Sequence, residues 1–241
     1  MVVKSELKLI KSLQQKKYRN EHGLFVIEGK KALEELLTSI ILPYKVYVTK
    51  TANFNVKYDC LQLVSAKELQ QMSALKNPNG VLGVFHIPPS EPIGFKDWIL
   101  VLDGIQDPGN LGTIIRLCDW FGISSLVCSQ DTVDCYNPKV LQATMGSIAR
   151  VNISYTDLSL FLQGNILPVY GSFMNGASVY ESELPKKGIL IMGNEGNGIS
   201  IAVKQFCTYS VSVPQYGKAT TESLNVGTAS AILLNEIRRR E

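Results

Sequence analysis

The 241-residue sequence predicts an α/β protein in two parts: a small N-terminal α/β domain and a larger C-terminal domain built on a parallel sheet. Three observations support this fold class. Short apolar segments alternate along the chain with segments of helical periodicity. Three prolines fall within residues 88–92, which is the composition of a stiff linker. Residues 98–102 then read Trp-Ile-Leu-Val-Leu, apolar on both faces like a buried parallel strand.

The N-terminal part alternates helices and strands. Residues 4–15 predict a short basic helix, and the polar, mostly basic cluster 16–20 is expected to break it. Ser65 and Glu68 have the spacing of a capping box, in which each side chain satisfies a backbone amide at the start of a helix. Apolar runs and periodicity predict the remaining elements, which are strands at 24–28, 45–49, 61–64 and 81–87 and a helix at 30–37.

The C-terminal part repeats the alternation of strand and helix that parallel sheets require. A helix is expected at 110–121, where apolar residues share one face. The other predicted elements are strands at 125–128, 166–170, 188–192 and 209–213, a helix near 139–149 and a last helix at about 225–239. We expect domains at 1–90 and 97–241.

Composition limits the chemistry that the chain can perform. Its five cysteines include no Cys-x-x-Cys pair and it has only two histidines, so we expect neither a disulfide framework nor a metal site. No apolar run approaches the ~20 residues of a membrane helix. The first six residues lack the apolar region of a signal peptide. The expected protein is cytoplasmic and has no membrane partner.

Charge is unevenly distributed. Residues 1–97 hold 14 Lys and Arg against 9 Asp and Glu, a net +5, whereas residues 98–241 have a net charge of −2. Six basic residues lie within the first 19 positions, opposed only by Glu6. This pattern favours an N-terminal part that binds a polyanion. A solvated, lysine-rich surface is the alternative.

Polar, glycine-rich segments follow three of the predicted strands, at 103–110, 193–198 and 214–223. Ligands of open α/β sheets bind beyond the carboxyl ends of the strands, so these segments are the predicted site. The chain contains neither the Gly-x-Gly-x-x-Gly fingerprint of dinucleotide binding nor a Walker loop. A nucleotide-binding oxidoreductase is therefore disfavoured.

Each segment also has a purely structural explanation. The guanidinium of Arg116 suits a phosphate, but it could instead pair with Asp119 on the protein surface. The loop 193–198 allows close approach of a ligand to the backbone, yet it could be a plain turn. Ser223 and Asn225 could simply cap the last helix.

Taken together and in order, three segments resemble the motifs of the SpoU (TrmH-type) branch of the SPOUT RNA methyltransferases. They are Asp107–Arg116, Ile191–Gly196 and Glu222–Val226. Val213-Pro214 and the segment 137–147 fit the same resemblance, although Thr144 and Ser147 stand where relatives often have Ser and Ala. The N-terminal part, with 17–19 and 25–29, resembles the ribosomal-protein-like substrate-binding domain that many such enzymes carry.

The resemblance implies a methyltransferase that moves a methyl group from S-adenosyl-methionine to a ribose 2′-hydroxyl of RNA, with ribosomal RNA favoured. It also implies a C-terminal trefoil knot and a homodimer. The implied catalytic residues are Arg116, Asn110, Glu195, Ser223 and Asn225, and the implied cofactor-binding residues are Gly193, Val213 and Leu224, with Gly171 and Ser172 as weaker candidates.

Two questions stay open at this stage. The family mechanism makes Arg116 the proton acceptor, whereas a phosphate clamp is the alternative, because arginine has a pKa above ~12 and rarely loses its proton. A non-catalytic RNA-binding protein of the same fold and a transfer-RNA ribose methyltransferase are the alternative functions.

Overall fold

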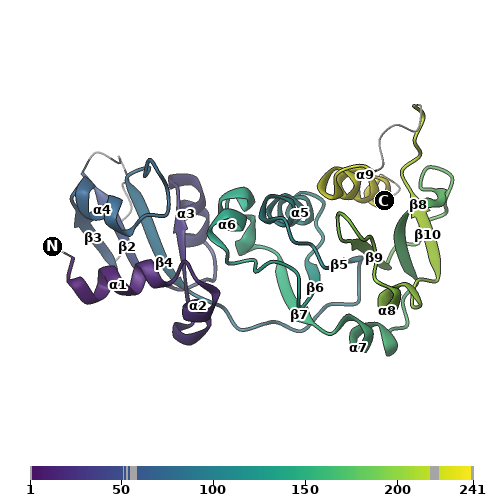
Figure 1. Ribbon diagram of the computed structural model, residues 1–241, viewed down its shortest axis with the longest axis horizontal. Coiled ribbons are helices and arrows are strands. Elements are labelled where there is room, and N and C mark those ends of the chain that lie inside the picture. Colours follow the sequence, from purple (N-terminus) through teal and green to yellow (C-terminus); the bar gives the residue numbers. More distant parts are fainter. Residues whose placement is uncertain (1, 51, 53, 55–58, 218–222, 240–241) are drawn as a thin grey trace. The chain divides into compact units, whose positions relative to one another are not determined.

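The computed structural model describes residues 2–50, 52, 54, 59–217 and 223–239, which form two compact units. Unit 1 comprises Met1–Pro89 and Asp134–Ala149, and unit 2 comprises Ser90–Val133 and Arg150–Glu241. Each unit contains one sheet (Figure 1). Unit 1 is therefore discontinuous in sequence, because its second piece comes from between two strands of the unit 2 sheet.

Unit 1 is built on a four-stranded sheet of order β1-β4-β2-β3, in which only β2 and β3 are parallel. Helices α1 and α4 pack together over one face. Helix α3 covers the other, where Leu33 lies over Gly83. The predicted capping box of Ser65 and Glu68 is confirmed at the start of α4. The elements are α1 (Lys4–Ser12), α2 (Lys16–His22), β1 (Leu24–Glu28), α3 (Lys30–Leu37), β2 (Pro43–Thr49), β3 (Leu61–Val64), α4 (Ala66–Met72) and β4 (Val81–His86).

The expectation that residues 16–20 break the first helix was wrong. The break lies earlier, at residues 13–15, and the basic cluster belongs to a second helix, α2. The cluster contains neither proline nor glycine, which are the residues that most strongly oppose a helix. Helix α2 ends at Gly23, whose φ of 62° is accessible to glycine.

The segment 134–149 wraps the outer strand β1 of unit 1. It contains α6 (Pro138–Thr144) and the 3₁₀ turn η1 (Ser147–Ala149). The ring of Tyr136 lies 4.7 Å from that of Phe25 on β1. Gly146 lies so close to α3 that an added Cβ would be 2.7 Å from the Cβ of Glu35. The segment thus completes the core of unit 1 and covers an otherwise open sheet edge.

Arg19 holds this segment from inside the unit. It is 2% exposed and donates to both Asp134 and the carbonyls of Leu13 and Gln14, the latter two at 2.9 Å. Arg19 is therefore a structural residue. It does not belong to the exposed basic surface on which the sequence placed it.

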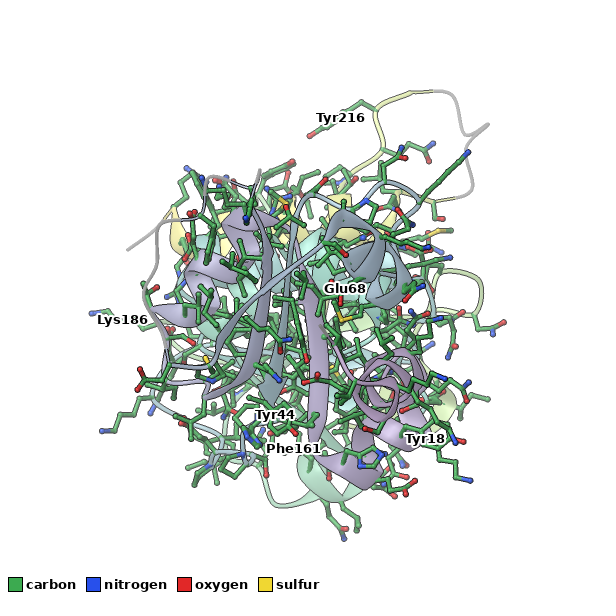
Figure 2. All side chains as sticks on the ribbon, turned by 90° about the vertical axis from the view of Figure 1, so that its left-hand side faces the viewer. Tyr18, Tyr44, Glu68, Phe161, Lys186 and Tyr216 are labelled. Atoms are coloured by element: carbon green, nitrogen blue, oxygen red, sulfur yellow. The ribbon has the colours of Figure 1, made fainter. Side chains whose placement is uncertain are left out.

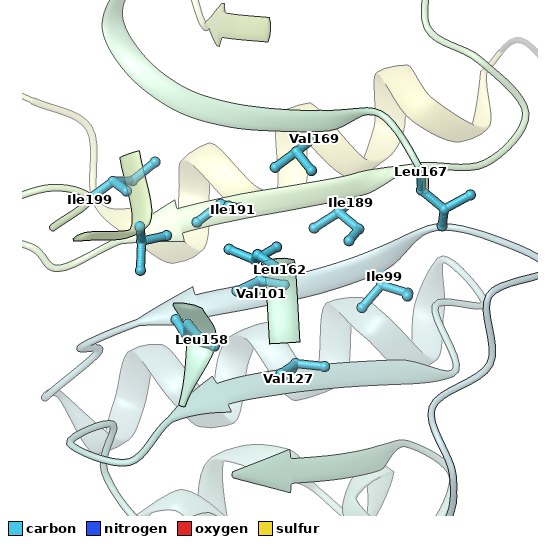
Figure 3. Packing of buried hydrophobic residues seen from close by; sticks show 11 residues of the cluster. Ile99, Val101, Val127, Leu158, Leu162, Leu167, Val169, Ile189, Ile191 and Ile199 are labelled. Atoms are coloured by element: carbon cyan, nitrogen blue, oxygen red, sulfur yellow. The ribbon is translucent and has the colours of Figure 1, made fainter. Parts of the chain in front are cut away.

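Unit 2 is built on a six-stranded, all-parallel sheet of order β10-β8-β9-β5-β6-β7. Helices α5 and α9 lie side by side on one face, and the short α7 and α8 cover the other (Figure 1). Figure 3 shows Leu158 and Leu162 of α7 packed on Val101 and Ile191 of the central strands. The elements are β5 (Ile99–Asp103), α5 (Pro108–Trp120), β6 (Ser125–Ser129), β7 (Asn152–Thr156), α7 (Leu158–Gln163), β8 (Val169–Ser178), β9 (Ile189–Gly193), α8 (Ile201–Lys204), β10 (Tyr209–Ser212) and α9 (Val226–Arg238).

The predicted α/β class with a parallel C-terminal sheet is confirmed, but several elements differ. Strand β7 was not predicted, because its residues are mostly polar and only half-buried at the sheet edge. Strand β8 begins at Val169, and Ile166, where the strand was expected to begin, is 92% exposed. The helix expected over 139–149 ends at Thr144, because Met145 and Gly146 both have positive φ, 52° and 99°.

Candidate functional site

Strands β5, β9 and β10 end at the same edge of the unit 2 sheet, and the three predicted site segments leave from those ends. Asp103 at the end of β5 lies in register with Gly193 at the end of β9. The carboxylate of Asp103 then accepts a hydrogen bond from the backbone N–H of Ser200 at 2.7 Å, so the loop after β9 is fixed to β5.

The start of α5 sets the position of Asn110. Asp107 is the N-cap, and its Oδ1 accepts from the backbone N–H of Asn110 at 2.7 Å. Pro108 occupies the first turn, where its missing N–H is not needed. Asn110 therefore lies in the first turn of the helix, with its side chain directed toward the neighbouring loops that it bonds.

Asn110 joins the other two segments through a chain of directed hydrogen bonds. Its Nδ2 donates to Oε1 of Glu195 at 2.9 Å. Its Oδ1 accepts from Nδ2 of Asn225 at 2.8 Å. Asn225 Oδ1 in turn caps α9 by accepting from the N–H groups of Gly227 and Thr228, at 3.0 and 3.2 Å. The structure thus brings Asn110, Glu195 and Asn225 together from three distant parts of the sequence.

The loop 193–198 is shaped by Asn194, a residue to which the sequence assigned no role. Its Nδ2 donates to the carbonyl of Gly104 at 2.6 Å, and its Oδ1 accepts from the N–H groups of Gly196 and Asn197. An amide between two glycines after a buried strand is the signal that could have identified it. Asn194 thereby presents Glu195 at the tip of a closed turn.

The backbone of the loop, and not only the approach of a ligand, requires glycine at position 193. A Cβ added there would lie 2.3 Å from the carbonyl carbon of Gly198 and from the nitrogen of Ile199. The glycine is therefore required by the turn itself. Gly171, a weaker candidate, is likewise explained by packing, since its Cβ would meet Phe173 and Cys207.

Arg116 lies on the exposed face of α5, about 9 Å along the helix axis from Asn110. Its side chain makes no hydrogen bond or ion pair with any residue that the structure describes. The structural alternative, a pair with Asp119, is wrong, because Asp119 is bound by the guanidinium of Arg150 at 2.8, 2.9 and 3.1 Å. The guanidinium of Arg116 is thus available to a ligand.

The side chains of the remaining candidates form no hydrogen bond with Asn110, Glu195 or Asn225 in the part of the chain that the structure describes. Val213 is half-buried directly after β10, Leu224 is 50% exposed, and Ser223 is exposed. Ser172 lies in β8, which pairs with β10. Glu222, the first residue of the third segment, lies outside the described residues.

Two features are missing from the part of the chain that the structure describes. It contains no group of three or more His, Cys, Asp or Glu side chains that could hold a metal ion. None of its helices has the length and apolar character needed to cross a membrane.

Comparison with known proteins identifies matches over both parts of the chain. Residues 97–235 match the model of the SpoU rRNA Methylase family, and residues 4–83 match the MRM3-like substrate binding domain. The chain is 34% identical over 239 residues to the 23S rRNA (guanosine(2553)-2′-O)-methyltransferase RlmP of Bacillus subtilis, covering 95% of this chain and 94% of that protein. It is 29% identical to the 23S rRNA (guanosine-2′-O-)-methyltransferase RlmB of Neisseria meningitidis, covering 79% and 80%.

Solved structures agree over the whole chain. A protein described as an RNA methyltransferase of the TrmH family, from Porphyromonas gingivalis, superposes with a TM-score of 0.91 at 35% identity and full coverage of both chains. An AdoMet-bound rRNA methyltransferase from Sinorhizobium meliloti superposes with a TM-score of 0.85 at 27% identity, covering 100% of this chain and 97% of that one.

Proposed function

Because this chain belongs to the SpoU rRNA methylase family, we propose that it transfers the methyl group of S-adenosyl-methionine to a ribose 2′-hydroxyl of ribosomal RNA. The observation that carries the proposal is the hydrogen-bonded chain Asn225–Asn110–Glu195 at the carboxyl edge of the parallel sheet. It joins the three motifs in one place. Both 23S rRNA relatives named above favour large-subunit RNA as the substrate.

The residues at this edge fit the cofactor chemically. Glu195 uses one carboxylate oxygen for Asn110, and its Oε2 accepts no hydrogen bond from the residues that the structure describes, so it can accept one from a cationic ligand. Val213 and Leu224 offer apolar surface to an adenine ring. We assign Val213, Leu224 and the backbone of Gly193 to binding S-adenosyl-methionine. When bound, this cofactor supplies an activated methyl group.

In the reaction, the protein's own residues position the RNA and the cofactor and provide fixed charges. We assign the exposed guanidinium of Arg116 to a phosphate of the RNA, because a planar fork binds two phosphate oxygens and stays protonated. This contact orients the ribose hydroxyl. Asn110, which Asn225 holds in place, fixes the carboxylate of Glu195, and Ser223 contributes a hydroxyl at the same edge.

We further propose a homodimer formed through α5 and α9. Trp120 at the end of α5 is 83% exposed, which is unusual for so large a ring on a solvent-facing helix. On α9, Ala229 and Ile232 are only half-buried, whereas Val226 and Leu233 are buried within the chain. Trp120→Glu should convert the dimer to a monomer in light scattering at micromolar concentration, and a monomeric wild-type protein would refute the dimer.

The function is tested by incubating the full-length protein with S-adenosyl-methionine and unmodified 23S rRNA, followed by mapping of ribose methylation. A single new 2′-O-methyl position is expected. We propose a cytoplasmic enzyme, as the sequence predicts. Methylation of unmodified transfer RNA instead would establish the alternative substrate. Cofactor binding without transfer to either RNA would establish a non-catalytic RNA-binding protein.

A further inference from the structure

Tyr216 is the most exposed aromatic side chain that the structure describes, at 87%. It lies in the loop that follows β10, and Figure 2 shows its ring projecting from that loop. The ring makes no contact with another described aromatic ring and no hydrogen bond with a described residue. Burial of such a ring in the core would stabilise the fold, so its exposure needs an explanation outside the fold.

Tyr216 follows a strand that ends at the edge of the sheet carrying the candidate site. Tyr216 is four residues past Ser212, the end of β10, and three past Val213. The far end of the same connection is Asn225, which is bonded to Asn110. Both ends of the connection therefore lie at the carboxyl edge, and Tyr216 follows the end of β10 at that edge.

Tyr209, at the start of the strand that precedes the Tyr216 loop, shows the contrast. Tyr209 begins β10, and its ring stacks on that of Tyr170 with centroids 4.8 Å apart and planes 20° apart. Tyr170 in turn lies against Trp98 at 5.4 Å. Tyr209 is 50% exposed, but its ring belongs to an aromatic stack of unit 2 at the opposite edge of the sheet. The Tyr216 ring lacks such a partner among the described residues.

We infer that Tyr216 is a substrate-contact residue, which stacks on an unpaired base of the RNA beside the target ribose. The inference rests on the proposed function, because it requires an RNA at this edge. Single-stranded RNA is bound by aromatic rings that stack on its bases, and this contact needs an exposed ring with two free faces. In the proposed function Arg116 holds the RNA backbone, so that ring and guanidinium would contact different parts of one strand.

The test compares Tyr216→Ala, Tyr216→Phe and the matched control Tyr209→Ala in the full-length protein. Binding of in vitro transcribed 23S rRNA and the KM for that RNA are measured, together with cofactor affinity by calorimetry. Tyr216→Ala should weaken RNA binding and raise the KM for RNA about tenfold, because it removes the stacking contact with one base. Cofactor affinity should be unchanged. Tyr216→Phe should retain most of the affinity. Tyr209→Ala should lower the melting temperature but not change RNA binding by the folded protein.

Three outcomes would overturn the inference. They are RNA affinity within twofold of wild type for Tyr216→Ala, equal losses for the Ala and Phe variants, and a change in dimer dissociation with RNA binding unchanged. The binding measurement needs no turnover. If the wild-type protein bound 23S rRNA without methylating it, the proposed function would fail, while the comparison of the tyrosine variants would still decide the role of the ring.

Discussion

Asn225 donates its side-chain N–H to the side-chain oxygen of Asn110 across 2.8 Å, and this one bond joins the starts of the two long helices α9 and α5. The other amide group of each residue is also used. Asn225 Oδ1 caps α9, and Asn110 Nδ2 holds Glu195. The orientation of both amides is therefore fixed, and the bonds run in one direction from a helix terminus to a carboxylate.

The first prediction separates capping from positioning. Asn225→Asp keeps an oxygen that can cap α9 but loses the donor to Asn110, and it places a charge beside that residue. Helix stability should survive and methyl transfer should fall about 10- to 100-fold, the effect of losing a hydrogen bond in a network with a charged group. Asn225→Ala should also lose about 1 kcal/mol of unfolding free energy. Equal activity in the Asp variant and wild type would show that the hydrogen bond from Asn225 to Asn110 has no role in methyl transfer.

A second prediction concerns Arg116. Arg116→Ala should abolish methyl transfer and leave the calorimetric Kd for S-adenosyl-methionine unchanged, because the guanidinium has no partner among the described residues of the chain. Arg116→Lys keeps the charge but loses the planar fork. A phosphate clamp predicts strong impairment at every pH. Recovery of the lysine variant as pH approaches its reference pKa of ~10.4 would identify a proton acceptor instead.

A third prediction concerns Gly193. Gly193→Ala should lower the melting temperature and weaken cofactor binding together, because its methyl group would overlap the backbone of Gly198 and Ile199. Gly196→Ala is the matched control, since its added Cβ would lie 3.6 Å from the nearest atom, Oδ1 of Asn194. Thermal unfolding and calorimetry on both variants check this. Loss of binding with an unchanged melting temperature in Gly193→Ala would show that the glycine serves the ligand alone.

The fourth prediction tests the buried pair in unit 1. Arg19→Ala leaves Asp134 without its cation and two carbonyls without a donor, which should destabilise unit 1 by about 3–5 kcal/mol. Lys17→Ala, an exposed neighbour on α2, should change stability by less than about 0.5 kcal/mol. Urea unfolding measures both. If Arg19→Ala weakened RNA binding without any loss of stability, Arg19 would be an RNA-binding residue and not a structural one.

A fifth prediction concerns pH. Hydrogen bonds from the backbone of Ser65, from the backbone of Val2 and from the Ser65 hydroxyl lower the pKa of Glu68 from 4.5 to about 2. Because the folded pKa is the lower one, the carboxylate contributes its full stability above pH 4.5 and loses it as pH falls toward about 2. Glu68→Gln should therefore be less stable than wild type at pH 7. The difference between the urea unfolding midpoints of the two proteins should become smaller as the pH is lowered from 4.5 to 3. A constant gap would contradict this.

Much of the fold could be predicted from the sequence because local signals agree with the final structure. The strands at 24–28 and 61–64 and the helix at 30–37 have the predicted bounds, since apolar runs or helical periodicity mark them. Strand β7 could not be found this way, because its half-buried edge position requires few apolar residues. The packing of 134–149 on β1 depends on tertiary contacts such as Tyr136 with Phe25, which leave no periodic signal.

The sequence predicted where the candidate site lies, but not the hydrogen bonds that connect its side chains. The family resemblance of three segments at predicted strand ends implied Asn110, Glu195 and Asn225, and the structure places them within hydrogen-bonding distance. Which amide donates to which oxygen depends on helix starts that only the fold defines. The roles of Asn194 and Asp103 in closing the loop after β9 were missed for the same reason. The C-terminal knot stays a prediction from the family resemblance, since periodicity carries no information on threading.

The discontinuity of unit 1 has a consequence for how the chain is made. Synthesis delivers residues from the N-terminus, yet the core of unit 1 includes Tyr136 and α6, which emerge from the ribosome after β5, α5 and β6 of the other unit. Until residue 149 has been translated, the first 89 residues therefore lack Asp134, the anionic partner of Arg19, and the segment that packs on β1. The core of unit 1 can be completed only after these three elements of unit 2 have been translated, although its N-terminal part is translated first.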